Sequence, residues 1–217
     1  LRQVCEDAVL WPGGVRVAVN VPTAQFADTA FPARVTQALA SSELQPERLE
    51  LELGEDILTR QDSCLPDVFN ALRILGVRIV IDHFGKGGAP LHCLASAPVD
   101  KIKLDRAFVR GGAMADARNA AVFKTLVAMA DELGFETGVD AIEAMDELES
   151  VRGLGVQQVQ GNVYARPLTV EEAMDGMASG EWIIAPEGPS RFRDERRTVF
   201  RRVGLIHEDY RYEVMMR

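Results

Sequence analysis

The chain has 217 residues, of which 47% are hydrophobic and 26% are charged, a composition typical of a soluble globular protein. This composition excludes long disorder, a collagen-like repeat and a small disulfide scaffold, and no apolar run is long enough for a transmembrane helix. The formal net charge is −9, which argues against broad binding to nucleic acid or to an anionic membrane. The three cysteines are scattered and odd in number, so we expect reduced thiols in a cytoplasmic protein.

Short apolar runs alternate with helical patterns along most of the chain. In chain order, the pattern predicts strands at 15–22, 49–53, 78–82, 101–105, 136–141 and 157–163. Four helices are predicted at 32–41, 65–75, 120–133 and 145–151. Gly76 and Gly134 follow two of these helices in the position of a helix stop.

Alternating strands and helices predict an α/β fold with a parallel sheet. Two architectures fit this pattern, a (β/α)8 TIM-like barrel and an open doubly wound sheet. Polar residues stand at the carboxyl ends of several different strands, which favours the barrel, because barrel active sites are built there. About six of the eight strands are visible, within residues 1–180. We therefore expect the two exposed sheet edges to be covered by residues outside the chain, by the tail or by a neighbouring chain.

The polar residues at the strand ends form the candidate site. Asn20, Glu52 and Asp82 offer oxygen ligands of the kind that Mg²⁺ or Mn²⁺ prefers. Lys103 is a compact cation that suits a phosphate or a water nucleophile, and Asp140 and Glu143 follow the next strand. Each residue alone reads as a solvated loop residue or an ion-pair partner. Together they indicate two-metal phosphodiester hydrolysis.

Six segments in order resemble the motifs of EAL domains, the bacterial phosphodiesterase domains for cyclic di-GMP. Residues 81–87, IDHFGKG, resemble the family's DDFGTG motif. The other segments are 19–22 (VNVP), 51–55 (LELGE), 98–105 (PVDKIKLD), 139–143 (VDAIE) and 160–168 (QGNVYARPL), and the resemblance covers residues 1–180.

The resemblance implies a barrel of EAL type that binds cyclic di-GMP across the carboxyl ends of its strands. Asn20, Glu52, Asp82 and His83 would stand at metal-ligand positions, with Mg or Mn bound if the domain is active and none otherwise. Lys103 would position water or phosphate, with Asp140 and Glu143 as nearby carboxylates. Glu55 would hold the loop after Asp82. Gln160, Gly161 and Pro167 would line the ligand site.

Four departures from the family pattern converge on the metal site. The signature Glu-Ala-Leu is absent, and we expect it to lie upstream of the first residue. His83 replaces the second aspartate of DDFG and removes a negative charge. Asp140 replaces a longer glutamate, and Lys86 brings a cation into the loop after Asp82. These departures predict weak or no hydrolysis.

The tail after Pro186 differs from the body. Residues 186–217 contain eight Arg and six acidic residues. We read 181–190 as a linker and 191–217 as a basic extension. The spacing of Arg197 and Arg201 resembles the RxxxR motif that opens PilZ domains, which also bind cyclic di-GMP, and 210–216 would be the first strand of such a domain. The other interpretation is a basic helix that packs on the barrel or on a partner.

The sequence thus predicts a degenerate EAL domain that acts as a cyclic di-GMP receptor or an interaction module. The alternative is an active metal-dependent phosphodiesterase that forms linear pGpG once the missing glutamate is supplied. An unrelated barrel enzyme or a structural domain is the third hypothesis. We expect a homodimer or a protein partner, with no nucleic acid bound and no membrane insertion.

Overall fold

A computed structural model describes residues 1–12, 14–110, 116–164, 167–179, 200–207 and 210–216. Its strands are β1 (Arg16–Asn20), β2 (Leu49–Gly54), β3 (Arg78–Phe84), β4 (Lys101–Leu104), β5 (Glu136–Val139), β6 (Gln158–Gln160), β7 (Phe200–His207) and β8 (Tyr210–Met216). Its helices are α1 (Arg2–Val9), α2 (Thr23–Phe26), α3 (Phe31–Ser42), α4 (Leu65–Leu75), α5 (Ala117–Glu132), α6 (Met145–Gly153) and α7 (Val170–Ser179). Short 3-10 turns η1 (Pro46–Arg48), η2 (Glu55–Thr59), η3 (Leu91–Ser96) and η4 (Arg106–Phe108) complete the elements.

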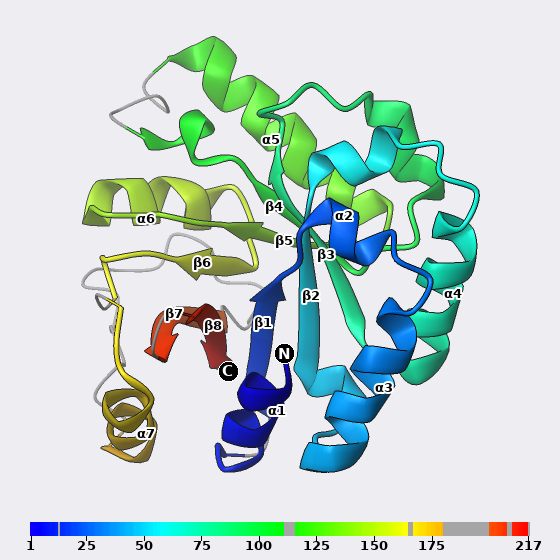
Figure 1. Ribbon diagram of the computed structural model, residues 1–217. Helices are drawn as coiled ribbons and strands as arrows, with labels where there is room; N and C mark the ends of the chain where they lie inside the picture. The colour runs from blue at the N-terminus through cyan, green and yellow to red at the C-terminus, as the bar shows by residue number, and fades with distance from the viewer. Residues whose placement is uncertain (13, 111–115, 165–166, 180–199, 208–209, 217) are drawn as a thin grey trace.

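The strands form a closed barrel in the order β1 to β8. Strands β1 to β6 are parallel to one another, and β7 continues in parallel next to β6. Strand β8 runs antiparallel to both β7 and β1, and so closes the ring. Helices α3, α4, α5 and α6 lie around the outside of the strands (Figure 1). The six predicted strands and the TIM-like barrel are confirmed.

The tail covers the sheet edges that the sequence left open. In Figure 1, β7 and β8 lie between β6 and β1. Gln158 of β6 stands opposite Phe200 of β7, and Val17 of β1 stands opposite Val214 of β8. Of the three covers that we considered, the structure uses the tail. Residues 210–216 do form a strand, but its described neighbours are strands of the barrel, and the PilZ resemblance stays a prediction.

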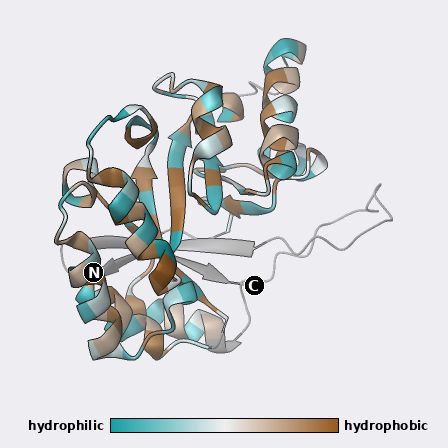
Figure 2. Cartoon of the chain, turned by 90° about the vertical axis from the view of Figure 1, so that its right-hand side faces the viewer, coloured by the Kyte–Doolittle hydropathy of each residue, from teal (hydrophilic) through white to brown (hydrophobic). Residues whose placement is uncertain are grey.

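The main hydrophobic core lies between the barrel and its helices. Successive strand residues point to opposite faces, and the outward set is apolar in every one of β1 to β6, as Leu49, Leu51 and Leu53 show in β2. Helix residues such as Val35, Leu72 and Phe123 pack against this set. Gly76 ends α4 with φ +86°, a left-handed conformation that glycine adopts without strain. Figure 2 shows that both hydrophilic and hydrophobic residues occur along the strands.

The inward set is largely polar, with Ala18 and Val80 as apolar members, and this is the main surprise of the fold. Contacts between strands that are not neighbours identify it: Glu50 of β2 reaches Lys101 of β4, and Arg16 of β1 reaches Glu136 of β5 at 3.4 Å. Such contacts must cross the barrel interior. Two polar layers result, one at each end of the strands. In the described residues, no helix has the length and the hydropathy needed to cross a membrane.

Candidate functional site at the carboxyl ends of the strands

The strand register brings the predicted site residues to one mouth of the barrel. Asn20 at the end of β1 stands opposite Glu52 of β2, and Asp82 of β3 stands opposite Gly54, two residues further along β2. Lys103 of β4 stands opposite Gly138 of β5, and a Cβ at Gly138 would lie 3.3 Å from Cγ of Lys103. The absence of a side chain at Gly138 therefore leaves room for the lysine stem.

The Lys103 ammonium lies at the centre of this layer. Its Nζ is 3.0 Å from Oε2 of Glu52 and 3.5 Å from Oδ1 of Asp82, and it also contacts Asp140. The Lys103 side chain is only 1% exposed, so these ion pairs are shielded from solvent. Three carboxylates surround one ammonium, and the layer keeps an excess of negative charge that favours binding of cations.

Two strained residues follow the carboxylates at the ends of β3 and β5. His83 has φ +54° and Ala141 has φ +57°, both in the left-handed region that few non-glycine residues adopt. The turn at His83 lets its backbone N–H donate to Oδ1 of Asp82 at 2.8 Å. His83 lies at an irregularity in the register of β3, which continues to Phe84, and Ala141 follows Asp140 just after the end of β5.

His83 stands where the family motif has a second aspartate, and its ring lies between two acids. Nε2 is 3.3 Å from Asp82 and Nδ1 is 3.4 Å from Asp105. The His83 side chain is 53% exposed, so its outer edge faces solvent. Asp105 also accepts a hydrogen bond from the Ala107 amide at 2.8 Å. The sequence did not single out Asp105, although it ends the quoted segment 98–105.

Glu55 anchors the loop after β3. Its Oε2 accepts a hydrogen bond from the Gly85 amide at 2.8 Å. A Cβ at Gly87 would overlap Oε1 of Glu55, so the loop backbone passes directly over this carboxylate. Glu55 is buried, and this contact places it where the family resemblance expects a loop-holding residue.

A backbone hydrogen bond also holds the end of β6 near Asp140. The Ile142 amide donates to the carbonyl of Gln160 at 3.0 Å, and a Cβ at Gly161 would overlap the backbone of Ile142. Glu143 is exposed, and its amide donates to the carboxylate of Glu147 at 3.1 Å. Pro167 is exposed, and Arg197 lies outside the described residues. Arg201 lies in β7 opposite Val159 of β6.

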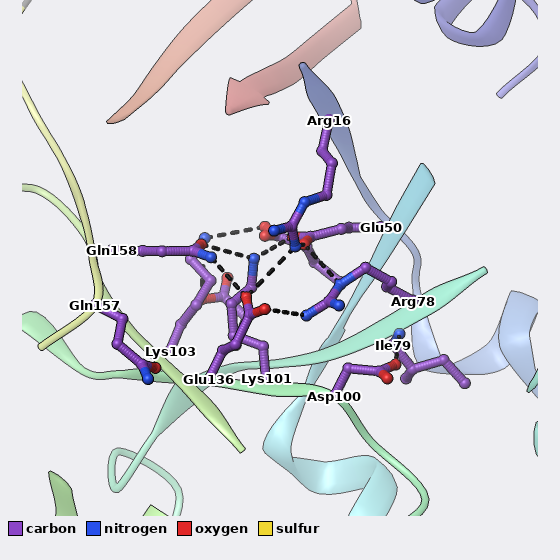
Figure 3. Close-up of polar contacts among 12 residues, drawn as sticks. Arg16, Glu50, Arg78, Ile79, Asp100, Lys101, Lys103, Glu136, Gln157 and Gln158 are labelled. Atoms are coloured by element: carbon purple, nitrogen blue, oxygen red, sulfur yellow. Dashed lines mark hydrogen bonds and ion pairs between the residues drawn. The ribbon is translucent and has the colours of Figure 1, made fainter. Parts of the chain in front are cut away.

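The second polar layer, at the amino ends of the strands, was not predicted (Figure 3). Glu50 and Lys101 are fully buried and contact each other, and Lys101 also donates to Gln158 at 3.0 Å. Arg16 and Arg78 pair with Glu50 at 2.9 and 3.2 Å. The signal was present, because LELELG in β2 and KIKL in β4 alternate polar and apolar residues with a period of two.

The ligand atoms at the carboxyl-end mouth suit a hard divalent cation. Asn20, Glu52 and Asp82 offer only oxygen atoms, which Mg²⁺ and Mn²⁺ prefer. In the part of the chain that the structure describes, no three acidic, histidine or cysteine side chains are grouped closely enough to hold a metal ion by themselves. The Lys103 ammonium lies between two of the candidate ligands, so a cation would share their charge with it.

A family model for the EAL domain matches residues 1–167. The chain therefore belongs to the EAL domain family. A curated relative, the bifunctional diguanylate cyclase/cyclic di-GMP phosphodiesterase MucR of Pseudomonas aeruginosa, is 30% identical over 82% of this chain and 26% of its own length. The EAL domain described here spans about a quarter of the length of the curated relatives it matches.

Solved structures agree with the assignment. The PaMucR phosphodiesterase in complex with c-di-GMP has a TM-score of 0.72 and 30% identity, covering 79% of this chain and 71% of that one. The manganese/cy-diGMP complex of Klebsiella pneumoniae BlrP1 has a TM-score of 0.70 at 23% identity, covering 76% of this chain and 42% of that one. The second match supports the fold alone.

Proposed function

We propose that this EAL domain serves in cyclic di-GMP signalling, binds cyclic di-GMP at the carboxyl-end mouth of the barrel, and acts as a receptor or interaction module with weak or no hydrolysis. The observation that carries the proposal is His83, which places an imidazole between Asp82 and Asp105 where the family motif has a carboxylate. The relatives' names support the ligand, because MucR is a cyclic di-GMP phosphodiesterase and PaMucR was solved with c-di-GMP.

A bound divalent cation would be held by Asn20, Glu52 and Asp82. It would supply Lewis-acid activation of a phosphodiester and of a water nucleophile. Lys103 would then balance the remaining negative charge of Asp140 and orient a phosphate oxygen. With His83 in place of a carboxylate, the layer offers one negative charge fewer for a second cation, which is why we expect hydrolysis to be weak.

The second candidate function is active hydrolysis of cyclic di-GMP to linear pGpG. It is favoured by the convergence of Glu52, Asp82 and Asp140 on Lys103 at one mouth. In this function Lys103 and Asp140 would act directly on the phosphodiester and water. Gln160, Gly161 and Pro167 would line the ligand site in either function.

One experiment separates the two functions. The 217-residue chain is incubated with cyclic di-GMP and Mn²⁺, Mg²⁺ or EDTA, and binding and pGpG formation are measured by calorimetry and chromatography. The receptor function predicts binding in all three buffers with little pGpG. Rapid pGpG formation would establish the phosphodiesterase instead, and absence of binding in every buffer would rule out both.

The remaining proposals concern the setting of the domain. Three free cysteines support a cytoplasmic location, where thiols stay reduced. We propose a homodimer or a protein partner as the means of output. For the basic tail, the PilZ beginning remains a proposal, whereas a basic helix is wrong for residues 200–207 and 210–216, which form strands β7 and β8.

A further inference from the structure

The mouth at the amino ends of the strands holds a cavity of about 600 Å³. Four arginines from four different elements line it: Arg16 of β1, Arg48 of η1, Arg73 of α4 and Arg78 of β3. The lining also includes two acidic residues, Glu47 and Asp100. This volume falls within the range of about 300–1,000 Å³ that small-molecule sites occupy.

Two of the arginines are held in place by the carboxylates of buried Glu50 and partly buried Glu136. Arg16 Nη1 is 2.9 Å from Glu50 and 3.4 Å from Glu136. Arg78 donates from Nε to Glu50 at 3.2 Å and pairs through Nη2 with Glu136 at 2.9 Å. Figure 3 shows Arg16 and Arg78 converging on this pair of acids. A guanidinium has five N–H donors, so the pairing leaves Nη1 of Arg78 for a ligand.

The other two arginines differ in how firmly their side chains are held. Arg48 is fixed by backbone carbonyls, because Nε donates to Val15 at 2.8 Å and Nη2 donates to Ala8 at 2.6 Å. Arg73 is exposed in the last turn of α4, and no acidic residue within the described ranges pairs with it. The cavity thus has three positioned guanidiniums and one that is free to close on a ligand.

The charge of the cavity is opposite to that of the rest of the molecule. Its lining holds four arginines and two acidic residues, and with Lys101, Glu50 and Glu136 beneath it the positive groups outnumber the negative ones by one, although the whole chain has a net charge of −9. Asp100 is already engaged, since its carboxylate accepts from the Ile79 amide at 2.8 Å. The opposite mouth holds three carboxylates around one ammonium. One mouth therefore suits cations, and the other suits anions.

Guanidinium groups bind carboxylates and phosphates with two parallel hydrogen bonds, and a phosphate group also has the extra acceptor oxygens and charge needed to engage several arginines at once. We propose that the cavity at the amino ends of the strands binds a small molecule that carries phosphate groups, at a site separate from the carboxyl-end mouth. The four arginines would contact the phosphate groups, and Arg73 would close over the ligand.

Equilibrium dialysis of the 217-residue chain with pyrophosphate, in EDTA and low salt, tests this site. EDTA removes divalent cations, so pyrophosphate cannot bind through a metal at the other mouth. We expect Arg73→Gln to weaken binding at least five-fold and Arg73→Lys to restore part of it. Added NaCl should weaken binding of the wild-type chain, because the attraction is electrostatic.

The matched control is Lys124→Gln, which removes one positive charge from an exposed position of α5 outside the cavity. It should bind pyrophosphate like the wild type. The site is refuted if the wild type fails to retain pyrophosphate in EDTA, or if the two glutamine variants bind it equally.

Discussion

His83 is the single residue that most affects what the carboxyl-end mouth can do. Its backbone lies in the left-handed region at φ +54°, which aspartate tolerates better than most residues. His83→Asp therefore fits the existing turn and adds a carboxylate next to Asp82 and Asp105. We expect it to increase Mn²⁺ affinity and to raise pGpG formation at least ten-fold, measured by calorimetry and chromatography.

The control for this substitution is His92→Asp, the same change at an exposed position of η3. It should leave both quantities as in the wild type. If His83→Asp changed neither metal affinity nor hydrolysis, the imidazole would not be what limits this site, and the proposed weak hydrolysis would need another cause.

The polar layer at the amino ends of the strands depends most on Lys101. Its ammonium is fully buried between Glu50 and Gln158. Lys101→Met removes one of the positive charges that pair with the Glu50 carboxylate, which is buried and cannot be solvated by water instead. We expect a loss of about 3 kcal/mol in the free energy of unfolding, at the lower end for a broken buried pair because Arg16 and Arg78 still contact Glu50.

Urea unfolding followed by circular dichroism measures this loss. Lys124→Met makes the same change on the exposed face of α5 and should alter the free energy of unfolding by less than about 0.5 kcal/mol. Equal effects from the two variants would mean that the buried layer contributes nothing specific to stability.

Among the elements, the β7–β8 hairpin has the most consequential position. Val214 of β8 stands opposite Val203 of β7 and opposite Val17 of β1, so one residue belongs to both seams. Val214→Pro removes a backbone donor from a strand with neighbours on both sides, which sheets rarely accommodate. We expect faster amide hydrogen exchange in β1 and β7, while exchange in β3 stays as in the wild type.

Val214→Thr is the matched variant, because it keeps the backbone N–H and the branched shape at Cβ. Its exchange pattern should follow the wild type, as measured by mass spectrometry of peptides from each strand. Unchanged exchange in β1 for Val214→Pro would show that β8 does not close the barrel in solution.

Elements with local signals were predicted well, and elements with distant partners were not. The bounds of α4 were predicted at Leu65–Leu75, since its apolar face and Gly76 are neighbours in sequence. The tail was predicted only as one of three possible covers for the sheet edges, because its place depends on pairing with β1, almost two hundred residues away. Periodicity reports which face of a strand is apolar and carries no information about its partner.

At the scale of the whole barrel, the sequence predicted one polar mouth where the structure has two polar layers. Glu52, Asp82 and Lys103 were found because they end their strands. Glu50 and Lys101 were missed, since they begin strands whose apolar residues drew the interpretation toward a buried sheet. In β2 and β4 every second residue is polar, at the start of the strand as well as near its end. This alternation indicates a barrel whose interior is polar and whose apolar face is covered by helices.

A buried thiol in the N-terminal helix makes the free energy of unfolding depend on pH. Cys5 of α1 is fully buried, and burial raises its pKa from 9.0 to about 11. The folded state therefore holds the proton more tightly than the unfolded state, so this contribution to stability is complete below pH 9 and is lost as the pH rises toward 11. We expect the urea midpoint to fall more steeply between pH 8 and pH 10.5 in the wild type than in Cys5→Ala. Other groups titrate equally in both chains, so parallel declines would show that Cys5 ionises in the folded state as easily as in the unfolded state.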